Sequence, residues 1–283
     1  MCSTMSAKSS ATTRWPTPPP EDFDYESKVW GEQELSLDPT TLGALRLRYC
    51  LEALQGVRGT VLELGCGAGS FLRALRSHRP DLAVVGLDLS ARALVHARAR
   101  GASRVVRGDV ARLPFVDGSV DAVVFFDVLE HVSHPDVLLA EAARVLRSGG
   151  RLHGFVPCEG SLYTLHGLAS RLGYSPKERY AGHIQRLTPG SLTSLLRRAA
   201  LRPTGRRWSG HYFTQLIDLG YFSFLAARGR NVEGTLEAVA ARKGGARGRL
   251  LGGALKAVAA LGYGESLLLR NIPAAGVHVT AVR

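Results

Sequence analysis

The sequence predicts an α/β protein built on a doubly wound, mostly parallel, Rossmann-like sheet of seven strands, with a helical insertion before the last strand. Three observations support this fold class. Short apolar runs alternate with segments whose apolar residues recur at helical spacing. The runs are apolar throughout, as in strands that are buried on both faces. The first run also leads directly into a cluster of glycines.

The elements follow in order along residues 39–208. Leucines at helical intervals predict a first helix over 39–54. Apolar runs predict six strands, over residues 60–64, 82–87, 104–107, 120–126, 151–156 and 203–208. Further helices are expected over 70–75, 90–100, 135–146 and 188–200. Ser90 and Thr188 are suited to N-cap two of these helices, and Pro189 suits a first helical position.

The rest of the chain divides by composition. Residues 1–22 are rich in Ser, Thr and Pro and predict a disordered tail, not a signal peptide. The main domain, with any cofactor site, is expected over 23–208. Residues 209–275 are too many for a plain loop and predict a largely helical insertion that caps the substrate. Residues 276–283 have strand composition and are expected to form the final edge strand.

Cysteine spacing, hydropathy and charge indicate the cellular location of the protein and the kinds of partner that it binds. The four cysteines (Cys2, Cys50, Cys66 and Cys158) show no metal-ligand spacing, so we expect neither a metal site nor a disulfide framework, and a cytoplasmic location. No apolar run is long enough to span a membrane. The net charge of +12 is uneven: residues 151–283 hold 19 Lys and Arg against 6 Asp and Glu, giving +13, whereas residues 1–150 give −1. We interpret this as a solvated basic surface and do not expect nucleic acid as a partner.

The most informative segment is Val61 to Gly69, VLELGCGAG. A strand that runs straight into glycines lets a ligand approach the backbone, because side chains would fill that space. Ser70 stands where a dinucleotide fingerprint needs its third glycine, and no P-loop ending follows. The pattern indicates a nucleotide-like ligand, while a purely structural turn stays open.

Two acidic residues follow later strands. Asp88 ends the second strand, where a carboxylate can accept hydrogen bonds from both hydroxyls of a ribose. Capping of the next helix is its alternative role. Asp109, after the third strand, can accept from an adenine amine or can form an Asx-turn.

Five ordered motifs resemble the class I S-adenosylmethionine-dependent methyltransferases, in the group that includes ubiquinone, menaquinone and small-molecule enzymes. They lie at residues 61–69, 86–90, 108–115, 121 with 126–132, and 144–152. The resemblance covers about a third of the chain closely and implies S-adenosyl-L-methionine as the cofactor.

The resemblance also implies a set of site residues. Around the methionine part of the cofactor it places Glu63, Gly65, Cys66, Gly67 and Gly69. Asp88 would hold the ribose, and Asp109 with Val110 would border adenine. Leu89 is a further expected cofactor-binding residue. Phe126 and Asp127 would flank the amino-acid end. His131 and His183 are the candidate catalytic residues, although either one could be purely structural.

The function implied is methyl transfer to a small-molecule or lipid-like acceptor, on oxygen, carbon or nitrogen. The alternatives are a nucleic-acid or protein methyltransferase, a nicotinamide-dependent oxidoreductase and a non-catalytic cofactor-binding protein. The Asp/Asn-Pro-Pro-Tyr/Phe signature of adenine methylation in DNA is absent after the fourth strand. The aromatic-rich stretch over 212–225 could cover a greasy acceptor, contact a membrane surface or pack as core. No oligomeric state is predicted.

Overall fold

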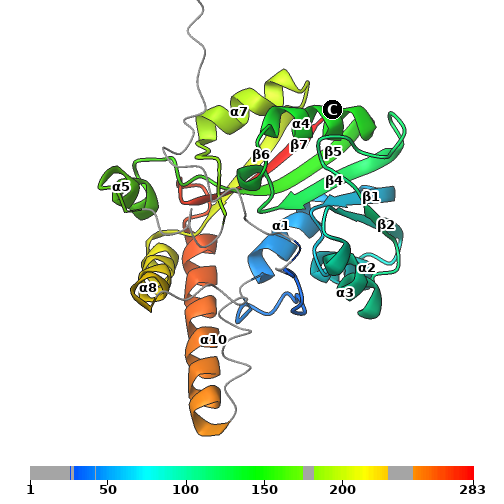
Figure 1. The fold of residues 1–283 in the computed structure, drawn as a ribbon. Coiled ribbons are helices and arrows are strands. Elements are labelled where there is room, and N and C mark those ends of the chain that lie inside the picture. The colour runs from blue at the N-terminus through cyan, green and yellow to red at the C-terminus, as the bar shows by residue number, and fades with distance from the viewer. Residues whose placement is uncertain (1–25, 27–28, 42, 175–181, 229–244) are drawn as a thin grey trace, which may run out of the picture.

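The computed structural model describes residues 26, 29–41, 43–174, 182–228 and 245–283. The tail predicted over residues 1–22 lies outside this part of the chain. The described strands form one seven-stranded sheet in the order β3-β2-β1-β4-β5-β7-β6 (Figure 1). Their bounds are β1 Gly59–Leu64, β2 Leu82–Asp88, β3 Val105–Arg107, β4 Val120–Phe126, β5 Leu146–Pro157, β6 Arg202–Ser209 and β7 Gly276–Val282.

The sheet is parallel from β3 to β5, and β7 runs antiparallel to both of its neighbours. This confirms the predicted doubly wound, mostly parallel architecture. The chain moves outward from β1 to β2 and β3, then returns to place β4 on the other side of β1. Ligands of open α/β sheets bind at such a reversal, beyond the carboxyl ends of the strands.

The prediction that the last strand lies at the sheet edge is wrong. β7 lies between β5 and β6, with His278 opposite Phe155 on one side and Arg207 on the other. Burial explains the exchange, because most residues of β7 are buried, whereas β6 has several exposed ones. A strand with charged residues suits an edge, and an apolar strand suits the interior of the sheet.

Helices cover both faces of the sheet, with α1, α2 and α3 on one and α4 and α7 on the other (Figure 1). The helical elements are α1 Ala44–Ala53, α2 Ser70–His78, α3 Ala91–Ala99, η1 Leu129–His131, α4 Pro135–Val145, α5 Leu165–Arg171, α7 Pro189–Arg198, α8 Tyr212–Arg228 and α10 Gly245–Leu268. The helices α8 and α10 confirm a helical insertion before the final strand. The helix α10 extends away from the sheet beside α8. Among the helices described, none combines the length and apolarity needed to span a membrane.

The predicted caps are present. The Ser90 hydroxyl accepts a 3.1 Å hydrogen bond from the amide of Ala93, and Thr188 accepts one of the same length from Ser191. The helix α4 ends at Val145, and β5 begins at the next residue, five residues earlier than predicted. A register shift against β4 accommodates these extra residues.

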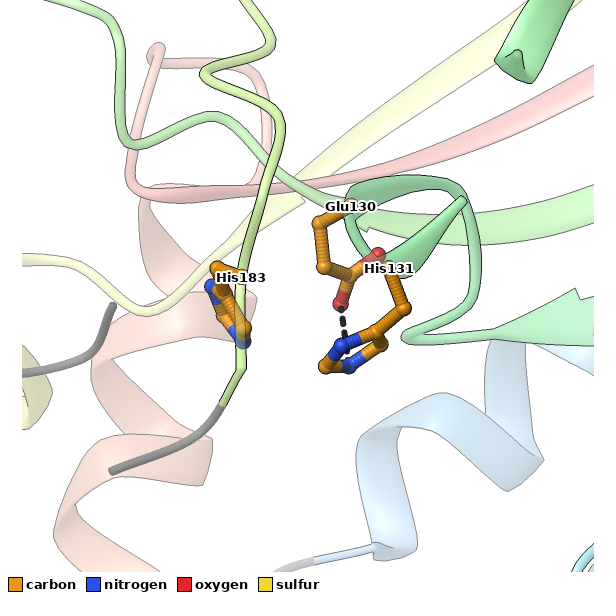
Figure 2. A group of neighbouring side chains, drawn as sticks. All are labelled: Glu130, His131 and His183. Carbon is orange, nitrogen blue, oxygen red and sulfur yellow. Dashed lines mark ion pairs between the residues drawn. The ribbon is translucent and has the colours of Figure 1, made fainter. Parts of the chain in front are cut away.

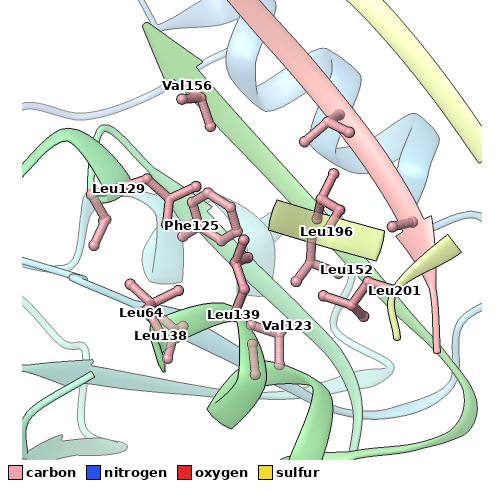
Figure 3. Packing of buried hydrophobic residues seen from close by; sticks show 14 of the residues in the cluster. Leu64, Val123, Phe125, Leu129, Leu138, Leu139, Leu152, Val156, Leu196 and Leu201 are labelled. Carbon is pink, nitrogen blue, oxygen red and sulfur yellow. The ribbon is translucent and has the colours of Figure 1, made fainter. Parts of the chain in front are cut away.

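The core has two apolar parts, one on each face. Between the sheet, α4 and α7, Phe125 packs among leucines such as Leu138, Leu139 and Leu196 (Figure 3). The second cluster lies under α1, α2 and α3 and includes Leu47 and other apolar side chains. Truncation of such a buried leucine to alanine typically costs about 2–5 kcal/mol.

Two buried histidines interrupt the second face. The Nδ1 atom of His153 on β5 lies 3.1 Å from the hydroxyl oxygen of Thr280. The Nε2 atom of His278 on β7 lies 3.1 Å from the hydroxyl oxygen of Ser209. Burial lowers the pKa of His153 to about 3 and lowers that of His278 well below its usual value. Both rings are therefore neutral in the folded protein near pH 7.

This burial predicts acid sensitivity. The folded-state pKa of His153, about 3, lies below that of an unfolded histidine, about 6.5. The unfolded chain therefore binds a proton that the folded chain lacks. The free energy of unfolding falls as the pH drops from about 6.5 toward 3, by up to about 1.4 kcal/mol per pH unit from this group. His153→Gln, which retains a hydrogen-bonding group, should flatten this dependence in urea unfolding measured from about pH 7 to about pH 5.

The matched control is His134→Gln, because His134 is exposed. That variant should retain the pH dependence of the unmodified protein. Equal slopes for His153→Gln and the unmodified protein would contradict the assignment.

Candidate active site

The glycine turn after β1 requires glycine for its backbone geometry. Gly65, Gly67 and Gly69 have φ angles of +68°, +52° and +76°, in the left-handed region that other residues rarely adopt. A Cβ atom at Gly67 would lie 2.6 Å from the carbonyl oxygen of Trp30. That oxygen also accepts a 2.7 Å hydrogen bond from the amide of Ala68, so the segment before α1 closes over the turn.

Asp88 connects this turn to the end of β2. Its Oδ2 accepts a 2.7 Å hydrogen bond from the amide of Gly67, and its Oδ1 accepts a 2.9 Å bond from that of Ser90. Each oxygen retains a second lone pair for another donor. Desolvation raises the pKa of the Asp88 carboxyl above its usual value. Ser90 caps α3, so Asp88 is not the cap; it positions the glycine turn.

Glu63 is a second acid at this edge, and it is buried. It lies opposite Gly86 in the pairing of β1 with β2, and only 3% of its surface is exposed. Its Oε2 has no hydrogen-bond partner among the described residues. Burial, and then repulsion from Asp88, raise the pKa of Glu63 well above its usual value. An acidic pair of this kind favours a ligand with cationic groups and hydroxyl donors, which fits a sulfonium nucleoside.

Two predicted site residues direct their side chains into the core. The Cys66 thiol packs against Gly86, where an added Cβ would lie 2.7 Å from its sulfur. The Phe126 ring stacks on Phe71 of α2, with 3.8 Å between centroids. At both positions only the backbone is available to a ligand.

The residues expected near the nucleoside base lie beyond β2 and β3. Leu89 is 57% exposed, and its apolar side chain suits packing against a ring. Asp109 accepts a 2.8 Å hydrogen bond from the amide of Ala111, which is the Asx-turn that the sequence left open. Val110 packs partly against the core. A contact of Asp109 or Val110 with adenine remains a prediction.

Asp127 lies directly after β4 in a left-handed conformation, with φ +52°. Its Oδ2 lies 2.5 Å from a guanidinium nitrogen of Arg46 on α1. The same guanidinium lies over the ring of Phe155, at 4.1 Å. Sequence reasoning missed Arg46, for which the only signal is a charge between two buried leucines, Leu45 and Leu47. The pair offers opposite charges to the two ends of an amino acid.

The two candidate catalytic histidines come together although 51 residues separate them. Their ring centroids lie 5.0 Å apart (Figure 2). The Nδ1 atom of His131 lies 3.0 Å from the carbonyl oxygen of Gly182, and that of His183 lies 3.0 Å from a carboxylate oxygen of Glu159. Desolvation lowers the pKa of His131 to about 3.

Glu130 is the neighbour that sequence reasoning undervalued. It precedes His131 in η1, and its side chain is completely buried. Burial, and then repulsion from Asp127, raise its pKa to about 8. The sequence shows a Glu-His pair here, but nothing local indicates that the glutamate points inward toward His183.

Comparison with known proteins identifies this part of the chain. Residues 62–153 match the family model described as a methyltransferase domain. These residues form a methyltransferase domain. The order of the sheet is that of the class I S-adenosylmethionine-dependent enzymes, which confirms the resemblance and the cofactor that it implies.

Individual relatives agree with this family. A probable S-adenosylmethionine-dependent methyltransferase of Mycolicibacterium smegmatis is 42% identical over 93 residues, which are 32% of this chain and 35% of that protein. A ubiquinone biosynthesis O-methyltransferase of Bordetella avium is 27% identical over 66% of this chain and 81% of the relative.

A solved structure extends the likeness beyond the matched domain. It is a chain from the complex between the Haloferax volcanii Trm112 methyltransferase activator and a methyltransferase, with a TM-score of 0.52 and 21% identity. The match covers 86% of this chain and 92% of that one, and it shows a shared fold. The stronger sequence matches span well under half of their relatives' lengths, so they concern the methyltransferase domain alone.

The glycine turn of the methyltransferase domain can be tested with a matched pair of variants. Gly67→Ala places a methyl group against Trp30 and should weaken binding of S-adenosylmethionine at least tenfold, about 1.4 kcal/mol. Gly56→Ala imposes the same left-handed strain, at φ +75°, but meets nothing within 4 Å.

Titration calorimetry with the cofactor checks both variants. Gly56→Ala should bind as the unmodified protein does, because Gly56 precedes β1 and lies at the opposite end of this strand from the turn. If Gly67→Ala also binds normally, the ligand does not approach this backbone.

Proposed function

We propose that this chain transfers a methyl group from S-adenosylmethionine to a small-molecule or lipid-like acceptor. The observation that carries the proposal is the left-handed glycine turn facing two acids, the buried Glu63 and the half-buried Asp88, at the reversal point of the sheet. When bound, the cofactor supplies a sulfonium methyl group, which a nucleophilic atom of the acceptor displaces in line.

In this proposal the chain's own residues hold the cofactor from three strands. Asp88 accepts hydrogen bonds from the ribose through the lone pairs that Gly67 and Ser90 leave. Glu63 balances the positive charge of the methionine part. Arg46 and Asp127 bind its carboxylate and ammonium groups, since their ion pair already presents both charges at the end of β4.

The acceptor side is assigned to His131 and His183. Both belong to segments beyond the carboxyl ends of the parallel strands, where the acceptor must meet the methyl group. We infer that their neighbouring rings contact and orient the acceptor. Closure of such a site against water is the other requirement of methyl transfer.

Exposed apolar side chains support a lipid-like acceptor. They gather on and around α5 and α8, which contact each other. The exposed residues are Leu162, Tyr163, Leu168, Leu172, Tyr174, Tyr212, Leu216 and Ile217. A surface of this kind suits a greasy acceptor or a peripheral membrane contact. The Bordetella avium relative is named as an O-methyltransferase of ubiquinone biosynthesis, and ubiquinone is itself a lipid-like molecule.

A reducing cytoplasm is the compartment that we propose. Cys50, Cys66 and Cys158 are buried thiols without disulfide partners. Burial raises the pKa of each, so they are inert toward oxidation.

The ribose assignment predicts a specific loss of affinity. Asp88→Ala should weaken binding of S-adenosylmethionine and of its demethylated product by at least about tenfold, the effect of one lost pair of charge-assisted hydrogen bonds. The control is Asp81→Ala, at the opposite end of β2, where the carboxylate pairs with Arg79 on the surface. Calorimetry should show unchanged binding for the control. Equal dissociation constants for both variants would remove Asp88 from the site.

The activity itself is testable with labelled cofactor. We expect a mass increase of one methyl group in a phenolic or quinol-like compound when a metabolite and lipid extract is incubated with the protein. Asp88→Ala serves as the inactive control, because it lacks the ribose anchor. Addition of reduced nicotinamide cofactor should have no effect. Label found only in nucleic acid or protein would contradict the proposed acceptor class.

A further inference from the structure

Two segments that are distant in sequence are joined beside the proposed active site. The carbonyl oxygen of Glu130 accepts hydrogen bonds from the amides of Ile184 and Gln185, at 2.8 and 3.1 Å. The amide side chain of Gln185 donates to the carbonyl oxygens of Val132 and Ser133. The segment around His183 is therefore held against η1 by backbone contacts that leave the neighbouring side chains facing one another.

Three side chains converge there, as Figure 2 shows. One oxygen of Glu130 and one ring nitrogen from each of His131 and His183 lie within 4.8 Å of one another. Ligands of a tetrahedral zinc ion, each about 2.1 Å from the metal, lie about 3.4 Å apart. Side-chain rotations that move each ligand atom by about 1 Å therefore suffice to bring the three atoms around one ion.

Both histidines have the tautomer that metal binding requires. The carbonyl oxygen of Gly182 can only accept a hydrogen bond, so Nδ1 of His131 carries the proton and Nε2 carries the lone pair. The carboxylate of Glu159 has the same effect on His183. Carboxylate and carbonyl partners of this kind orient the histidine ligands of metal sites.

Glu130 supplies an independent indication. Its side chain is fully buried, and neither carboxylate oxygen accepts a hydrogen bond within the described part of the chain. Nε2 of His131 lies 3.9 Å from Oε1 of Glu130. Buried carboxylates are nearly always paired or bound to a metal, because desolvation without compensation is costly.

We propose that Glu130, His131 and His183 bind a divalent cation of the zinc class, with Glu159 as a positioning residue for His183. Two imidazoles and one carboxylate form a ligand set that suits such ions and leaves coordination positions open. The sequence did not predict this site, because the ligands have no motif spacing and come from two segments.

The methyl acceptor can occupy an open coordination position of the cation, an inference that rests on the proposed function. A hydroxyl acceptor can bind the cation through its oxygen, which lowers the pKa of that hydroxyl and favours the alkoxide or phenolate. The acceptor oxygen then forms the bond to the methyl carbon, the carbon–sulfur bond breaks with its electrons going to sulfur, and the hydroxyl proton leaves to solvent. The site would thus select oxygen as the methylated atom.

Zinc binding tests the site without reference to activity. The full chain, freed of any affinity tag and stripped with a chelator, is titrated with zinc chloride in a calorimeter. We expect one ion per chain. Glu130→Gln and His183→Gln should each weaken binding more than about 100-fold, and Glu159→Gln about 10- to 100-fold. His166→Gln, another buried histidine but on α5, should bind zinc normally.

Two readouts separate a lost ligand from a lost fold. Circular dichroism and calorimetry with S-adenosylmethionine report whether each variant remains folded. Cobalt(II) substitution gives absorption bands that report nitrogen and oxygen ligation directly. Absence of stoichiometric zinc binding by the unmodified chain, or equal affinity in all variants, would overturn the proposal.

The acceptor role has its own outcome. If zinc binds but S-adenosylmethionine does not, the proposed function fails and the cation site stands. If both bind, methylation of a catechol probe should stop on chelation and return with zinc. Methylation that is indifferent to the chelator would overturn the role in catalysis.

Discussion

The hydrogen bond from the amide of Gly67 to the carboxylate of Asp88 is the contact on which the arrangement of the active edge depends. It joins the turn after β1 to the end of β2, and the parallel register of the two strands sets its length. The orientation of the turn then directs Ala68 toward the carbonyl oxygen of Trp30. A hydrogen bond to a charged acceptor contributes about 1.5–3 kcal/mol, enough to hold a left-handed turn in one conformation.

Acidic side chains are concentrated at this edge, although the protein is basic overall. Glu63, Asp88, Asp127 and Glu130 all lie at or just beyond the ends of β1, β2 and β4. Only Asp127 has an arginine within ion-pair distance among the residues described. Mutual repulsion in a poorly hydrated site is unfavourable unless cationic ligands compensate it. A sulfonium nucleoside and a divalent ion would each reduce this repulsion, so the two proposals account for the same electrostatic feature.

Local sequence patterns predicted what local physics determines. The apolar run of β4, the glycine turn and the caps at Ser90 and Thr188 depend on residues close in the chain, and each was predicted. The order of β6 and β7 depends on pairing between segments about 70 residues apart, and the prediction failed there. The meeting of His131 with His183 and the pairing of Arg46 with Asp127 are likewise products of tertiary structure. No periodicity along the chain encodes them.

The central place of β7 has a consequence for biosynthesis. A ribosome completes β5 and β6 well before it reaches Gly276, yet neither strand has its shared partner until residues 276–282 emerge. During that interval the nascent chain exposes two unpaired strand edges, with the apolar segments of α5 and α8 nearby. Edges of this kind are templates for association with other chains. The sheet therefore becomes continuous from β5 to β6 only when the last strand of the chain inserts between them.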